Sequence, residues 1–139
     1  MGDSRTILLV EDDGDFREAI RQVLHRSGYT VLPAADATEA ESRLATGLPD
    51  LLLVDMLLPV RSGFQVLRLV KEQSDGRVPA IMVSGLTSPI HQQYAHAAGA
   101  DRFLVKPFRL AQLLDTLESL CPLPRPATRP HAPTVAACS

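Results

Sequence analysis

The sequence predicts an α/β fold in which a parallel sheet of five short strands is covered by helices on both faces. Apolar runs that are too short for helices alternate with segments whose apolar residues recur at helical spacing. Alternation at this spacing implies right-handed crossovers, which join strands that run parallel within one sheet. The run 51–54 illustrates the pattern, because it ends directly at the carboxylate of Asp55, and Pro59 stops further pairing soon afterwards.

The predicted strands are nearly continuous apolar runs, as expected for strands buried on both faces. They lie at 6–10, 29–32, 51–54, 78–83 and 102–105. The predicted helices run from about 16 to 28, across 34–46, onward from 63, and across 88–98 and 109–120. Gly28 suits a C-cap, Thr38 and Glu41 form a candidate N-terminal cap pair, and Gly63 permits a tight turn.

Length and composition fit one globular domain. With 139 residues, 45% of them apolar and 22% charged, the chain can bury about two thirds of its unfolded surface. A formal net charge of -2 provides no basic surface for nucleic acid and no attraction to anionic membranes. No apolar run is long enough to span a bilayer, and the N-terminus lacks the layout of a secretory signal, so we expect a cytoplasmic protein.

The composition changes near the C-terminus. Five prolines fall between 122 and 133, where few apolar side chains remain to be buried. We therefore expect a domain at 1–120 and, at 121–139, a Pro-rich disordered tail or a linker to a further domain. A ligand for a proline-binding module is the less favoured alternative. The two cysteines, Cys121 and Cys138, cannot form a zinc site alone and are interpreted as incidental.

Polar groups follow four of the five predicted strands. They are the acidic cluster Glu11, Asp12 and Asp13, then Asp55, Ser84 and Lys106. Each has an ordinary explanation by itself, as a helix cap, a turn residue or a solvated lysine. The ends of parallel strands meet at one edge of a sheet, however, and four such groups at one edge favour a shared site.

A phosphoryl-transfer site would use this set of residues. Asp12 and Asp55 would repel each other unless a hard cation with oxygen ligands, for which we expect Mg²⁺, lay between them. A carboxylate oxygen of Asp55 would attack the phosphorus atom in line. Ser84 could donate a hydrogen bond to one phosphoryl oxygen, and Lys106 could pair with another.

These segments together resemble the receiver domain of two-component response regulators. The resemblance covers roughly 5–120 and rests on Ile7-Leu8-Leu9-Val10-Glu11-Asp12-Asp13, Asp55-Met56-Leu57-Leu58-Pro59 with Gly63, Ser84-Gly85 and Lys106-Pro107-Phe108. It implies a flavodoxin-like, doubly wound sheet with strand order 2-1-3-4-5.

The resemblance also implies a role for each site residue. Asp55 would be the phosphoacceptor, and Asp13 would only begin the first helix. Mg²⁺ would be bound by Asp12, Asp55 and the backbone carbonyl of Leu57, with Glu11 contributing indirectly. On phosphorylation, Ser84 would move toward the phosphoryl group and Phe103 would rotate inward. Phe103 could equally be an ordinary core aromatic.

By the same resemblance, the chain would be a signalling switch that turns over no separate substrate. The phosphoryl donor would be a sensor histidine kinase or a histidine phosphotransfer protein, since none of the four histidines here suggests a phosphotransfer site. The face formed by 88–98, 102–105 and 109–120 would contact a downstream protein, an output domain or a second copy in a homodimer. Leu57 and Leu86 offer no polar group to orient a hydrolytic water, so we expect slow autodephosphorylation.

Three alternatives fit less well. A docking or dimerisation module that works without phosphorylation would not need the intact set of Asp12, Asp55, Ser84 and Lys106. A haloacid dehalogenase-type phosphohydrolase needs an acidic residue where Leu57 stands, as well as a cap domain. A flavin-binding protein needs small residues after the first strand to hold a phosphate, and acidic residues stand there instead.

Overall fold

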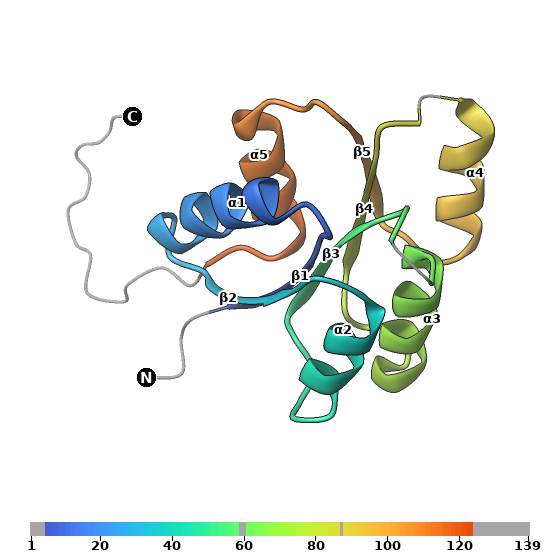
Figure 1. Cartoon of the computed structure of the whole chain (residues 1–139), viewed down its shortest axis with the longest axis horizontal. Helices are drawn as coiled ribbons and strands as arrows, with labels where there is room; N and C mark the ends of the chain where they lie inside the picture. The colour runs from blue at the N-terminus through green and yellow to red at the C-terminus, as the bar shows by residue number, and fades with distance from the viewer. Residues whose placement is uncertain (1–4, 59–60, 87, 124–139) are drawn as a thin grey trace.

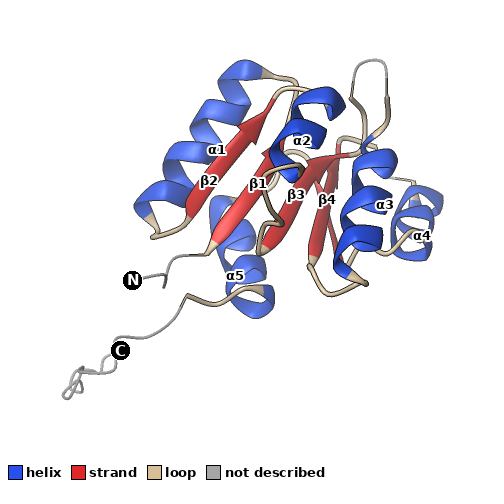
Figure 2. Cartoon of the chain, turned by 90° about the horizontal axis from the view of Figure 1, so that it is seen from below, coloured by secondary structure: helices blue, strands red, loops and turns tan. Residues whose placement is uncertain are grey.

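The computed structural model describes residues 5–58, 61–86 and 88–123, and within them five parallel strands form one sheet. The strands are β1 (Thr6–Val10), β2 (Thr30–Ala34), β3 (Leu51–Asp55), β4 (Ala80–Ser84) and β5 (Arg102–Val105). Their order is β2-β1-β3-β4-β5, which confirms the predicted topology. The strand arrows labelled in Figure 2 point the same way, so their carboxyl ends share one edge of the sheet.

Helices cover both faces of this sheet. They are α1 (Gly14–Arg26), α2 (Ala37–Leu44), α3 (Gly63–Ser74), α4 (Pro89–Ala97) and α5 (Leu110–Leu120). Figure 1 shows α1 and α5 on one side of the sheet and α2, α3 and α4 on the other. The fold is therefore the doubly wound α/β arrangement that the alternating pattern predicts.

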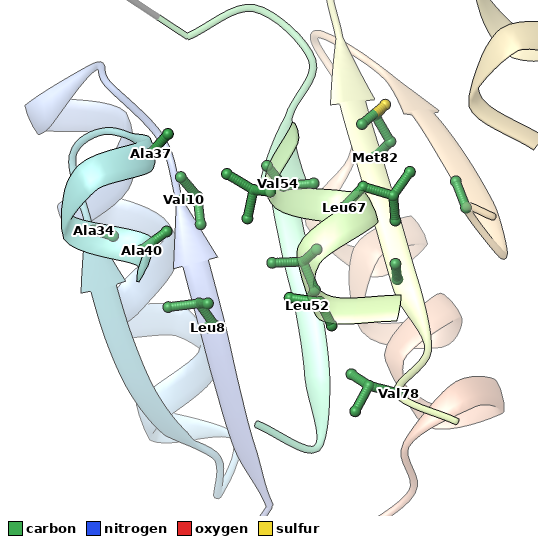
Figure 3. Close-up of a cluster of buried hydrophobic side chains, with 14 of the residues drawn as sticks. Leu8, Val10, Ala34, Ala37, Ala40, Leu52, Val54, Leu67, Val78 and Met82 are labelled. Carbon is green, nitrogen blue, oxygen red and sulfur yellow. The ribbon is translucent and has the colours of Figure 1, made fainter. Parts of the chain in front are cut away.

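Alternate side chains of each strand enter two separate apolar cores. Leu8, Leu52 and Met82 contribute to the core beneath α2, α3 and α4, part of which is shown in Figure 3. Their neighbours in the sequence, such as Leu9 and Leu53, contribute to the core beneath α1 and α5. Full burial of one such side chain stabilises the fold by about 1.5–3 kcal/mol. Burial on both faces explains why these strands are apolar throughout instead of alternating with polar residues.

The second helix begins later than predicted, and its cap pair is different. Strand β2 continues to Ala34, so α2 starts only at Ala37. Asp36 is the N-cap: its Oδ1 accepts from the Glu39 amide at 2.8 Å, and Glu39 Oε1 accepts from the Ala35 amide at 2.7 Å. The predicted pair of Thr38 and Glu41 is therefore wrong, because the same capping-box spacing occurs two residues earlier.

Strand limits also differ by one or two residues. Pro33 lies inside β2, which the sequence prediction ended at 32. The strand tolerates a residue without an amide hydrogen because β2 pairs only with β1 and forms an edge of the sheet. Strand β4 begins at Ala80, not at 78. Strand β5 has the predicted limits, and Gly28 and Gly99 follow their helices with positive φ values of 107° and 111°.

The described chain continues to pack past the last helix. Cys121 is buried, and its carbonyl accepts a hydrogen bond from Tyr29 Oη at 3.1 Å. Arg5 Nε donates to the Pro122 carbonyl at 3.2 Å, and Leu123 lies against Gly28. Residues 121–123 thus contact the domain, while the rest of the predicted tail, 124–139, lies outside the described residues. None of the described helices is long and apolar enough to cross a membrane.

Candidate functional site

The sheet topology brings the polar strand ends together. Asp55 is the last residue of β3 and Ser84 the last of β4, and Glu11 and Lys106 directly follow β1 and β5. Backbone hydrogen bonds hold these ends in register, including one from the Lys106 amide to the Ser84 carbonyl at 2.8 Å. The shared edge predicted from the sequence is therefore present.

Lys106 links the two buried carboxylates of this edge. Its Nζ donates to Glu11 Oε1 and to Asp55 Oδ2, each at 2.8 Å. The carboxylate side chains are only 4% and 9% exposed, and that of the lysine is 25% exposed. Removing the Lys106 ammonium would leave the negative charges of Glu11 and Asp55 close together with little water around them, which is strongly unfavourable.

Burial and hydrogen bonding act in opposite directions on the pKa values of Glu11 and Lys106. Burial raises the pKa of Glu11, and the hydrogen bonds from Lys106 and the Asp13 amide only partly offset that effect. Burial also acts to lower the pKa of Lys106, but the hydrogen bonds to Asp55 and Glu11 outweigh it, so the pKa of this ammonium is raised. The lysine consequently keeps its positive charge at neutral pH.

The local backbone fixes the second oxygen of Asp55. Oδ1 of Asp55 accepts a hydrogen bond from the Leu57 amide at 2.9 Å. The Gly63 amide donates to the Met56 carbonyl at 2.8 Å, so the start of α3 closes over the segment after β3. A Cβ atom at position 63 would lie only 2.0 Å from the Asp55 carbonyl oxygen. Gly63 is thus needed for close approach to the site, a stronger constraint than the turn predicted from the sequence.

Three carboxylates could hold a hard cation. Glu11, Asp12 and Asp55 each offer an oxygen, and these atoms lie within 4.8 Å of one another. Asp12 is exposed, whereas the other two are buried, so the cluster opens to solvent on one side. Leu57 lies two residues after Asp55, and its side chain is 57% exposed. Hard carboxylate oxygens with an open side fit Mg²⁺, which retains several of its waters when bound to proteins.

Of the two predicted switch residues, Ser84 ends a strand at the site, and none of the hydrogen bonds of the described residues joins its hydroxyl to Asp55. Ser84 is fully buried, and its Oγ accepts from the Leu86 amide at 3.0 Å. Phe103 is partly buried and packs against the core beneath α2, α3 and α4. Asp13 is the N-cap of α1, accepting from the Phe16 amide at 3.1 Å, which confirms its predicted place at the helix start.

Two side chains of α1 reach the site without having been predicted to do so. Arg17 Nη1 donates to the Glu11 carbonyl at 2.7 Å. Lys106 Nζ lies over the ring of Phe16, 4.6 Å from its centroid. The sequence prediction placed position 16 only at the start of the helix expected at about 16–28. The available signal was its position in the first turn after the acidic cluster, at the same edge as Asp55.

The chain is similar in sequence to known proteins. The model of the response regulator receiver domain family matches residues 7–118. The chain is 36% identical to the response regulator MprA of Mycobacterium ulcerans over 114 residues, which are 82% of this chain and 49% of that protein. It therefore spans about half the length of the curated relatives that it matches.

Solved structures show the same similarity. The Vibrio cholerae chemotaxis protein CheY4 superposes with a TM-score of 0.79 at 34% identity, covering 84% of this chain and 98% of that one. The HemR receiver domain from Leptospira biflexa gives a TM-score of 0.79 at 29% identity, covering 88% and 98%. The family match spans most of the described chain and all four polar strand ends. The chain therefore belongs to the response regulator receiver domain family of two-component signalling.

Proposed function

We propose that this receiver domain accepts a phosphoryl group on Asp55 from a sensor histidine kinase or a histidine phosphotransfer protein. The observation that carries the proposal is the link from Lys106 to both Glu11 and Asp55, each at 2.8 Å, beside the exposed carboxylate of Asp12. If Lys106 only formed an ion pair that stabilises the fold, a single carboxylate partner would be enough. Three carboxylates and a single ammonium leave excess negative charge that a cation can neutralise.

The residues of the site divide the work of the transfer. A carboxylate oxygen of Asp55 forms the new P–O bond as the P–N bond to the donor histidine breaks, and the electron pair leaves with the imidazole nitrogen. The Lys106 ammonium stabilises negative charge on one phosphoryl oxygen, and the Ser84 hydroxyl donates to another. The proposed Mg²⁺ ligands are Asp12, Asp55 and the Leu57 carbonyl, with Glu11 acting indirectly. When bound, Mg²⁺ would supply neutralisation of the phosphoryl charge.

Phosphorylation would then change a surface. Ser84 Oγ accepts from the Leu86 amide, so a move toward the phosphoryl group removes that bond and releases the start of the β4–α4 segment. An inward rotation of Phe103 would accompany this move. The α4-β5-α5 face exposes Ile90, Tyr94 and Leu110, which are 52%, 62% and 46% accessible. This face would bind a downstream protein, an output domain or a second copy of the chain.

The phosphorylated state would last long, and the domain would turn over no separate substrate. Leu57 and Leu86 lie two residues after Asp55 and Ser84 and offer no polar side chain to orient an attacking water. Autodephosphorylation is therefore slow. The proposed site of action is the cytoplasm, without direct binding to nucleic acid or membrane, in keeping with the net charge of -2.

Intact-mass measurement tests the proposal. The full chain is incubated with Mg²⁺ and acetyl phosphate, with Asp55→Asn as the matched control. We expect a gain of one phosphoryl group in the wild type and none in the variant, and no gain when Mg²⁺ is chelated. A wild type that stays unmodified while its circular dichroism shows a folded domain would favour the phosphorylation-independent docking module instead.

A further inference from the structure

The Lys106 ammonium contacts an aromatic ring as well as two carboxylates. Its Nζ lies over the Phe16 ring at 4.6 Å from the centroid, within the range of a cation–π interaction. The two carboxylates occupy two of the three ammonium N–H donors. The third N–H has no oxygen acceptor among the described residues, so it can be donated to an incoming phosphoryl oxygen while the ring attracts the ammonium.

A second aromatic side chain holds the Phe16 ring in place. Phe108 meets it edge-on, with centroids 5.8 Å apart and ring planes at 76°. Phe108 lies two residues after Lys106, and Phe16 lies five residues after Glu11. The segment after each of these two charged residues therefore contributes one ring. The edge of one ring carries partial positive charge and the face of the other partial negative charge, which favours this geometry.

We propose that Phe16 is a positioning residue for phosphoryl transfer, because its ring face holds the Lys106 ammonium between Glu11 and Asp55 with one donor free. This inference rests on the proposed function of Asp55. An aliphatic side chain at position 16 could fill the same space but could not attract the ammonium. Lys106 would then sample rotamers that take it away from the reacting oxygen, at a cost to the transfer rate.

Ring electronics can be separated from packing by one substitution. A ring-trifluorinated phenylalanine at position 16 keeps the shape of the side chain and removes most of the negative charge on its face. We expect the rate of phosphorylation by acetyl phosphate to fall roughly three- to tenfold in this variant and in Phe16→Leu. Phe16→Tyr, which keeps an electron-rich ring, should retain a rate close to that of the wild type.

The position of the lysine can be observed directly. The chain has two lysines, Lys71 and Lys106, so selective isotope labelling gives two ε-methylene signals, with Lys71 as an internal reference. The Lys106 signal should be shifted upfield by the Phe16 ring in the wild type and should lose that shift in Phe16→Leu.

A second background tests whether the ring acts through the lysine. In Lys106→Met, the fluorinated ring should no longer change the rate of phosphorylation.

The outcomes distinguish this inference from the proposed function. A wild type that accepts no phosphoryl group overturns the function and the inference together. A wild type that is phosphorylated at the same rate as the fluorinated variant overturns only the inference. So does an equal effect of fluorination with and without Lys106, since it would show that the ring acts through packing alone.

Discussion

The carbonyl oxygen of Asp55 occupies the space in which a side chain at position 63 would begin. A Cβ atom there would lie 2.0 Å from that oxygen, and the Gly63 amide is hydrogen-bonded to the neighbouring Met56 carbonyl. The glycine that starts α3 is therefore in direct contact with the backbone of the proposed phosphoacceptor. Any larger residue must displace either the helix or the segment that carries Asp55.

Gly63→Ala should consequently destabilise the domain by about 1–3 kcal/mol, the usual cost of overpacking. Urea unfolding followed by circular dichroism measures the effect. Gly85→Ala is the matched control, because a Cβ atom at position 85 meets nothing within 4 Å. Equal stability of the two variants would show that the loop after β3 adapts freely.

Asp12→Asn should weaken Mg²⁺ binding roughly tenfold, since the cluster loses one of its three negative charges. Isothermal titration calorimetry of the unphosphorylated protein measures this affinity without reference to phosphorylation. Asp15→Asn serves as the control: it removes an exposed acidic residue from the first turn of α1 but lies outside the cluster. If both variants bound Mg²⁺ like the wild type, Asp12 would not be a ligand.

Leu57→Asn should shorten the lifetime of the phosphorylated state several-fold, which is less than the roughly 100-fold effect of a full general base. The amide can orient a water near Asp55, and the position is exposed enough to accept a polar group without loss of stability. Intact-mass spectra taken after removal of acetyl phosphate give the decay rate. Leu48→Asn changes another exposed leucine away from the site and should leave that rate unaltered.

A chain that ends after residue 120 should be less stable than one that ends after 123 by about 2–4 kcal/mol. The shorter chain loses the burial of Cys121 and the acceptor for the Tyr29 hydroxyl. Urea unfolding of both chains gives the difference. Tyr29→Phe should cost about 1 kcal/mol in the longer chain and little in the shorter one. The same cost in both would mean that the bond to Cys121 contributes nothing.

Local pattern was sufficient to predict most of the fold. Strands buried on both faces must be apolar, and runs such as 51–54 stand out for that reason. The limits of α2 were missed because Pro33 and Ala34 extend an edge strand, where a proline is tolerated. The pair Asp36 and Glu39 matches the capping box as well as Thr38 and Glu41 do, and only the end of β2 selects between them.

By itself, the sequence determined the sheet and the edge at which the polar strand ends meet, because strand burial and parallel topology follow from residue patterns along the chain. Only the tertiary structure decided which atoms meet there. Glu11 and Lys106 are 95 residues apart, and the ring of Phe16, from the first turn of α1, meets Lys106, which directly follows β5. Such contacts depend on how whole elements pack, and no spacing within one element records them.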